Sequence, residues 1–236
     1  MEGLNIFKDG VLVDVNVSFK EIPKGHLKKF RAIESKARYT VEWNSFNFPI
    51  SRTRFVPSRM HKAVIKRLKE CRAECEGLLK TLGISATGVL SWDVYEIALS
   101  RLEGNSEKYI AQTKQELETF LEESLCSLRI EAIDISEKVL HGIEEQGKNV
   151  NKRTLKYVRD FVNRFDAMDF VGDSKLSKLL QSLKVDFLDT VTEERMAYRQ
   201  ESVKELLRRR MEGVSKAATD PKDIPDLIAA YWASNP

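Results

Sequence analysis

The chain of 236 residues is predicted to have a mainly α fold, a helical bundle with a long helical hairpin arm and a small N-terminal β-hairpin or sheet. Three observations predict it. Valines alternate with other residues from Val11 to Phe19, which is the two-residue period of a strand. Apolar residues recur every three or four positions from His26 onwards, which is the helical period. One helical stretch is predicted to run unbroken from Ser106 to about Gln146, with Gly147 as its stop.

The first predicted segment, residues 1–57, combines the β element with a basic helix. Asp9-Gly10 stands between two apolar runs and favours a hairpin turn, because both residues tolerate positive φ. An isolated hairpin is marginally stable in water, so further strands or a helix should cover it. Residues 46–50 and 54–56 are candidates for such strands, and Pro49 would restrict the first of them to a sheet edge.

The second predicted segment, residues 58–219, is the bundle. Ser58 is the predicted N-cap of a helix that runs to about Leu79. Ser91 is predicted to cap a short helix with three regularly spaced apolar residues, Trp92, Tyr95 and Leu99.

The longest predicted helix, about 106–146, is the arm. Its apolar residues follow a 4-3-4-3 spacing through Leu121, Leu125, Leu128, Ala132, Ile135, Val139 and Gly142. This spacing is typical of a and d positions over three heptads and indicates coiled-coil packing against another helix of the same chain.

The rest of the chain is also predicted to be helical. Asn151 and Ser174 are the predicted N-caps of two helices. Thr190 with Glu193 has the spacing of a capping box, which indicates a break before a further helix. The third segment, residues 220–236, is predicted to be a tail helix.

Several classes of protein are disfavoured by what the sequence lacks. No apolar run approaches the ~20 residues that cross a bilayer, and the first residues lack the pattern of a secretory signal. The sequence contains no P-loop, no GxGxxG and no GxSxG motif. We therefore expect a protein with no membrane association, no cofactor and no enzymatic activity.

The three cysteines, Cys71, Cys75 and Cys126, are an odd set, which fits a reducing compartment and predicts a cytoplasmic protein. Cys71 and Cys75 allow two interpretations, half of a metal site or two buried thiols. The buried thiols are favoured, because both cysteines continue an apolar stripe that contains Leu68 and Leu79.

Charge is distributed unevenly along the chain, although the formal net charge is only +3. Residues 1–72 hold 16 Lys+Arg against 7 Asp+Glu, a net charge of +9. Residues 73–147 hold 6 against 15, a net charge of −9, and residues 148–236 hold 17 against 14, a net charge of +3. Such asymmetry indicates a polyanionic partner, an acidic protein partner or attraction between the segments themselves.

Basic residues form lines along the predicted helices, away from their apolar faces. The candidate nucleic-acid-binding residues are Lys28, Arg31, Arg38, Arg52, Arg54, Arg59, Lys62, Lys66, Lys69, Lys152, Lys156 and Arg159. Lines of cations with few acids between them track phosphates, and we favour this interpretation for the basic head, residues 1–72. Solvated helix faces and docking onto an acidic protein surface are the alternatives.

Several segments look similar to a known family. They are 4–15, 30–38, 44–49 and 54–57 near the N-terminus and 150–155, 159–165 and 169–173 later in the chain. These segments resemble an uncharacterised bacterial family known only as a domain of unknown function (number thirty-one fifty), and the likeness covers most of residues 4–190. The family has a longer insertion after its first strands, whereas residues 18–21 run almost at once into the first helix.

The resemblance implies a setting in phages, other mobile elements or defence systems, and a link to a MoxR-like AAA ATPase. It implies no reaction and no site residues. The expected function is therefore a non-enzymatic subunit of a nucleoprotein complex, which binds the backbone of DNA or RNA without sequence specificity. The acidic middle of the chain, residues 73–147, would hold partner subunits. A homo-oligomer is compatible with this role.

Two alternative functions stay open. The first is a protein-interaction adaptor that works with the AAA ATPase and binds no nucleic acid. The second is an enzyme of unfamiliar type.

Overall fold

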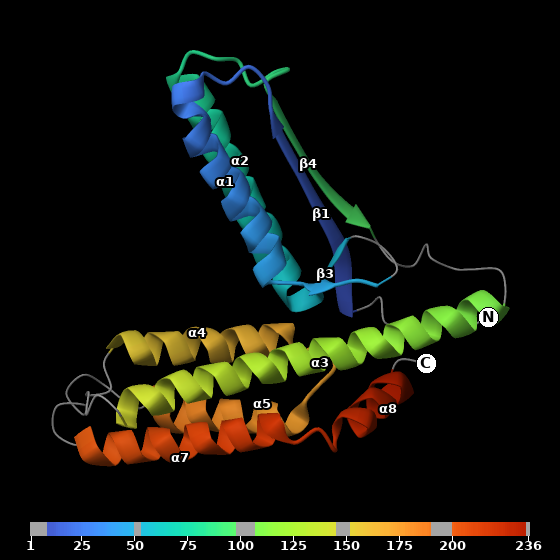
Figure 1. Cartoon of the computed structure of the whole chain (residues 1–236), viewed down its shortest axis with the longest axis vertical. Coiled ribbons are helices and arrows are strands. Elements are labelled where there is room, and N and C mark those ends of the chain that lie inside the picture. The colour runs from blue at the N-terminus through green and yellow to red at the C-terminus, as the bar shows by residue number, and fades with distance from the viewer. Residues whose placement is uncertain (1–8, 50–52, 98–106, 145–151, 190–199, 235–236) are drawn as a thin grey trace. The chain divides into compact units, whose positions relative to one another are not determined.

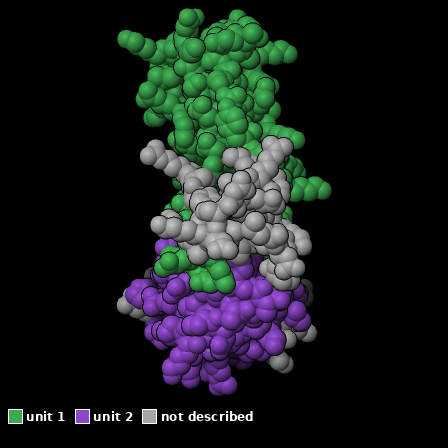
Figure 2. Space-filling view, turned by 90° about the vertical axis from the view of Figure 1, so that its right-hand side faces the viewer, with its two compact units in different colours: residues 1–120, 235–236 green, residues 121–234 purple. Residues whose placement is uncertain are grey.

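The computed structural model describes residues 9–49, 53–97, 107–144, 152–189 and 200–234. The chain divides into two compact units, of which unit 1 ends at Phe120 and unit 2 begins at Leu121 (Figure 2). Most of the described residues are helical, and a small sheet lies near the N-terminus, which confirms the predicted mainly α fold.

Unit 1 contains a four-stranded antiparallel sheet in the order β2-β3-β1-β4. Its strands are β1 (Gly10–Phe19), β2 (Phe46–Asn47), β3 (Arg54–Pro57) and β4 (Leu90–Ile97). The two additional strands predicted after the first helix are confirmed, and β2 lies at the sheet edge, as Pro49 predicted. β1 is central because it pairs with β3 at its start and with β4 from Leu12 to Phe19. The strand predicted before Asp9 falls outside the described residues.

The short helix predicted from Ser91 is wrong, because this segment forms β4. Trp92 is 8% exposed and Tyr95 is 53% exposed, so the two side chains lie on opposite faces, as the period of a strand requires. The pairing with β1 decides the structure here, since Trp92 lies opposite Val17 in a continuous ladder. Hydrogen bonds to a distant segment thus override the helical spacing of three side chains.

One face of the sheet is covered by two helices, α1 (Lys24–Trp43) and α2 (Ser58–Thr81), which lie side by side in Figure 1. Val13, Val15 and Val17 of β1 share a core with the buried stripes of both helices. Burial of this apolar surface is the main favourable contribution to the stability of unit 1. Cys71 and Cys75 belong to the same core, which confirms the buried-thiol interpretation.

Two predicted N-caps are displaced by one residue. Pro57, not Ser58, occupies the cap position of α2 and makes no side-chain capping hydrogen bond, because β3 continues to this proline and leads directly into the helix. Asp173, not Ser174, caps α5 by accepting a hydrogen bond from the amide of Leu176. The caps predicted at Asn151 and 190 fall outside the described residues.

Unit 2 consists of helices. The long helix α3 (Glu107–Glu144) enters it at Leu121 and is followed by α4 (Lys152–Met168), α5 (Ser174–Leu183), the π-helical turn η3 (Lys184–Leu188), α7 (Gln200–Thr219) and α8 (Ile224–Ser234). The predicted long helix is therefore confirmed. Its a and d residues from Leu121 to Val139 are buried, and Figure 1 shows α4, α5 and α7 alongside this part of α3.

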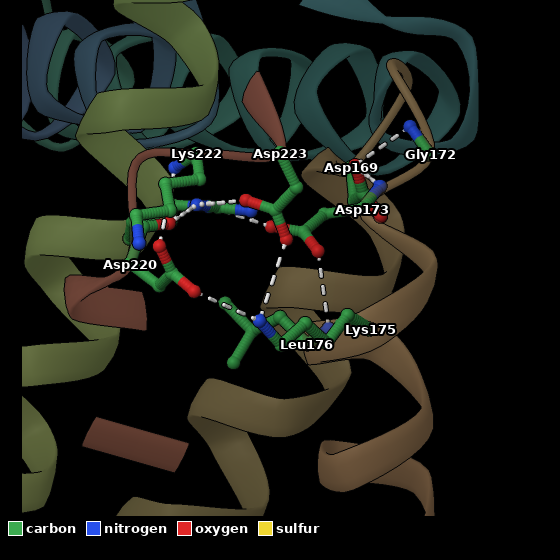
Figure 3. A network of polar contacts seen from close by, with 9 residues as sticks. Asp169, Gly172, Asp173, Lys175, Leu176, Asp220, Lys222 and Asp223 are labelled. Carbon is green, nitrogen blue, oxygen red and sulfur yellow. Dashed lines mark hydrogen bonds and ion pairs between the residues drawn. The ribbon is translucent and has the colours of Figure 1, made fainter. Parts of the chain in front are cut away.

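The turn between α4 and α5 places a carboxylate inside unit 2 (Figure 3). Asp169 Oδ1 accepts hydrogen bonds from the amides of Gly172 and Asp173 at 2.9 and 3.0 Å. Gly172 has φ +89°, a backbone conformation that is unfavourable for residues with a Cβ. This turn directs the Asp173 side chain into the interior of unit 2, where it is 1% exposed.

Candidate functional site

The predicted basic residues of unit 1 lie on the outer sides of α1 and α2. The buried stripes of the two helices face the sheet, so the opposite side of each helix faces solvent. Seven predicted site residues are exposed there: Lys28, Arg31 and Arg38 on α1, and Arg59, Lys62, Lys66 and Lys69 on α2. All seven are therefore on solvent-facing sides of the helix pair.

Some cations on these helices are neutralised by neighbouring acids. Among the described residues, surface ion pairs join Lys36 to Glu74, Arg38 to Glu34, Arg67 to Glu70, and Arg72 to Glu76. The hydrogen bond from Arg67 lowers the pKa of the Glu70 carboxyl below its usual range, which keeps that pair charged. Because Arg38 is paired with Glu34, it offers less positive potential than an arginine without an acidic neighbour would.

Other predicted site residues have no ion pair within the described part of the chain. They are Lys28, Arg31, Lys62, Lys66 and Lys69, and we call these five residues the basic face. Lys62, Lys66 and Lys69 follow one another at the three- and four-residue spacing that aligns side chains along a helix. Neighbouring cations in such a row stand about 5–6 Å apart, measured between Cβ atoms.

Two predicted site residues are used inside the fold. Arg54 donates hydrogen bonds from Nε to Ser45 Oγ at 3.0 Å and from Nη2 to the Glu42 carbonyl at 3.1 Å. Arg159 donates from Nη2 to the Leu188 carbonyl at 2.6 Å and so fastens η3 to α4. Both guanidinium groups are thus held by the chain itself.

The remaining predicted residues do not join the basic face. Lys156 is exposed on α4, and Lys152 is the first residue of that helix, with a side chain outside the described part. Both belong to unit 2. Arg52 falls outside the described residues.

A groove between α1 and α2, not predicted from the sequence, has a volume of about 370 Å³. Two exposed aromatic rings of α1, Tyr39 and Trp43, line it, and they stack at 5.6 Å between centroids with 22° between their planes. The other lining residues are Lys36, Thr40, Asn44, Met60, Ala63, Val64 and Arg67. The groove therefore combines flat apolar surface with two cations, Lys36 and Arg67, that are each paired with a glutamate.

A signal for this groove was present in the sequence. Tyr39 and Trp43 are four residues apart, and neither belongs to the apolar stripe that contains Ala37 and Val41. An aromatic pair away from the buried face needs another reason for its position. The partner residues on α2 could not be read from the sequence, because they depend on how the two helices pack.

The described residues show neither a metal-ligand cluster nor a membrane-spanning helix. No group of three or more His, Cys, Asp or Glu side chains converges in that part of the chain. Burial raises the pKa of the Cys75 thiol to about 12 and also raises that of Cys71, so both remain protonated at neutral pH. None of the described helices is long and apolar enough to cross a bilayer.

Comparison with family models, curated proteins and solved structures found no match to this chain. The resemblance of its segments to the family of unknown function therefore stays a prediction. The basic face and the groove are the features of the described residues on which a functional proposal can be based.

Proposed function

We propose that this chain is a non-catalytic subunit of a nucleoprotein complex and holds a nucleic-acid backbone on the basic face. The observation that carries the proposal is the set of five exposed cations, without ion pairs among the described residues, on the outer side of α1 and α2. Each Lys or Arg that neutralises a phosphate releases condensed counterions, and this release drives binding at physiological salt.

The spacing of the ion pairs supports a ligand rather than simple solvation. On the same two helices, Arg67 and Arg72 have acidic partners three or four residues away, whereas Lys62 and Lys69 have none in the described ranges. A helix that needs only solubility gains from such pairs along its whole exposed side. Lys62, Lys66 and Lys69 make no ion pair in the described ranges, although Glu70, which is paired with Arg67, stands four residues after Lys66. A polyanion would supply further negative charge.

The side chains involved predict binding without sequence specificity. Four of the five members are lysines, which act as point charges on flexible stems. Such contacts to phosphate position a protein on nucleic acid but do not read bases.

The test is a titration of fluorescently labelled random-sequence nucleic acid, single- and double-stranded, followed by anisotropy from about 50 to 200 mM salt. The test variant carries Arg31→Glu, Lys62→Glu and Lys66→Glu. A matched control carries Lys138→Glu, Lys178→Glu and Lys216→Glu, three lysines of unit 2 outside the basic face. Both variants have a formal net charge of −3 instead of +3, because each change removes two charges.

We expect the test variant to lose at least about tenfold in affinity at low salt and the control to lose much less. The slope of log affinity against log salt should also become shallower by about 2 for single strands, since three phosphate contacts disappear. Equal losses in both variants, or an unchanged affinity in the test variant, would contradict the proposal. Wild-type protein that binds neither strand form at low salt would contradict it too and would favour a protein-interaction adaptor.

A further inference from the structure

The aromatic side chains of the groove are exposed to an unusual degree. Tyr39 is 57% exposed and Trp43 is 47% exposed, although both are on a helix that buries a complete apolar stripe elsewhere. Their rings are stacked on each other with nearly parallel planes, so another flat ring can extend the stack. Exposed Tyr and Trp with this geometry are typical of sites that bind another flat or apolar group.

The opposite wall of the groove is suited to a flat ring. Met60, Ala63 and Val64 of α2 contribute apolar atoms, and small Ala63 leaves space above the helix backbone. The volume of about 370 Å³ falls in the range of sites that hold small organic groups. Lys36 and Arg67 also line the groove, each in an ion pair with a neighbouring glutamate.

The basic face borders the groove on the α2 side. Lys62 and Lys66 each precede a groove residue, Ala63 and Arg67, by one position. One position corresponds to a rotation of about 100° around a helix, so this basic row runs beside the groove and parallel to it. A ligand over the groove would therefore have the cations of this α2 row beside it.

We infer that this groove takes the bases of a single-stranded nucleic acid, with Tyr39 and Trp43 as the stacking surface. The inference rests on the proposed function, because the same strand's phosphates would lie along the basic face. Every base has a flat π-face, so stacking on aromatic side chains tolerates any sequence. A duplex keeps its bases stacked inside and offers none to the groove, so the site discriminates single strands from double strands.

Charge complementarity favours this occupant over a partner helix. Tyr, Trp and Arg also form the centres of protein interfaces, and an amphipathic helix would fit an apolar groove. A helix would, however, leave the lysines beside the groove without counter-charges unless it carried acidic residues in register. A nucleic-acid strand carries a phosphate at every nucleotide, so it supplies flat rings and negative charges together.

The first experiment compares single- and double-stranded affinities of a Tyr39→Ala/Trp43→Ala variant with those of the wild type. The matched control is Tyr95→Ala/Tyr157→Ala, which removes two other exposed aromatic rings, 53% and 43% exposed. We expect the test variant to lose about 5- to 150-fold for each stacked base on single strands. Its affinity for duplex and its salt dependence should stay unchanged, as should both affinities of the control.

The second experiment reads the contact itself, in a Trp92→Phe/Trp232→Phe variant whose single tryptophan is Trp43. Single-stranded nucleic acid should quench its fluorescence and protect it from a soluble quencher, because the base covers the indole ring. Duplex at a saturating concentration should do neither. This variant keeps both groove aromatics, so it tests the contact even if the double alanine variant fails to fold.

The two proposals fail in different ways. Binding to both strand forms with equal affinity, insensitive to Tyr39 and Trp43, would overturn the groove assignment and leave the basic face as the whole site. Absence of binding to any nucleic acid would overturn both proposals. Quenching of Trp43 by an acidic peptide but not by a single strand would overturn the inference and assign the groove to a protein partner.

Discussion

Arg129 and Asp173 form a buried ion pair in unit 2, with 2.8 Å between Nε and Oδ2. Their side chains are 4% and 1% exposed. Arg129 is on α3, whereas Asp173 is the N-cap of α5 and also accepts a hydrogen bond from Leu176. The same arginine contacts the Asp220 carbonyl at 2.5 Å and Asp223 Oδ1 at 2.9 Å, so one side chain joins α3 to the start of α5 and to the α7–α8 connection.

Substitution of Asp173 should therefore be costly. Asp173→Ala removes the cap of α5 and leaves a buried guanidinium without one of its counter-charges, so we expect a loss of about 3–5 kcal/mol in the free energy of unfolding. Denaturant-induced unfolding measures it. The control is Arg208→Ala, which breaks only exposed pairs on α7 and should cost less than about 1 kcal/mol. Similar losses in the two variants would show that the buried pair has no special role.

The cluster also predicts a sensitivity to acid. The hydrogen bond from Arg129 lowers the pKa of Asp223, and the backbone hydrogen bond from Lys222 lowers that of Asp220. Carboxyls with a lowered folded pKa stabilise the protein fully above their unfolded pKa, about 3.9, and lose this contribution as the pH falls through the folded value. The free energy of unfolding should fall below about pH 4, and Asp223→Asn should flatten this dependence. An Asp223→Asn variant with the same pH dependence of stability as the wild type would contradict this.

Substitutions at two glycines, Gly10 and Gly77, test the packing of unit 1. A Cβ at Gly10 of β1 would lie 2.6 Å from Phe55 Cε2 and 2.7 Å from the Val56 carbonyl oxygen, whereas a Cβ at Gly77 of α2 would meet nothing within 4 Å. Gly10→Ala should lower the free energy of unfolding by about 1–3 kcal/mol through overpacking. Gly77→Ala should raise it by up to about 1 kcal/mol, because alanine is the better helix former. Thermal melts that shift both variants in the same direction would contradict this.

The buried thiols should resist alkylation. Burial raises the pKa of Cys75 to about 12 and also raises the pKa of Cys71, and the reactive species is the thiolate. Iodoacetamide at about pH 8, just below the pKa of a free thiol, should leave both thiols unmodified in the folded protein, as read by mass spectrometry of peptides. Addition of denaturant should make both react rapidly. Rapid modification without denaturant would mean that α2 does not stay packed on the sheet.

Periodic elements were well predicted from the sequence, because burial on one side leaves a pattern along the chain. The alternation of β1 and the heptads of α3 both correspond to buried faces in the structure. The predicted helix at Ser91 was wrong because three apolar residues fit a helical spacing by chance, while pairing with β1 selected the strand. Caps were displaced by one residue at Ser58 and Ser174, since a cap depends on where the preceding backbone turns.

The candidate site was predicted only in part. The lines of cations were evident, because a three- and four-residue spacing places side chains on one helix side whatever the neighbours are. The sequence did not show which cations pair with an acid on another helix. The ion pair between Lys36 on α1 and Glu74 on α2 is an example. The internal hydrogen bonds of Arg54 and Arg159 were equally hidden, because they depend on where Ser45 and Leu188 lie in the fold.

By itself the sequence determined the mainly α class, the long helix, the strand β1 and the exposure of the basic residues along α1 and α2. Each of these follows from a local period that water and burial impose on neighbouring residues. Only the tertiary structure decided that Tyr39 and Trp43 line a groove with Met60 and Ala63. It also decided that Arg129 meets Asp173, 44 residues away. The reason is that both arrangements are contacts between distant segments, and a local period specifies which side of a helix is buried but not what lies against it.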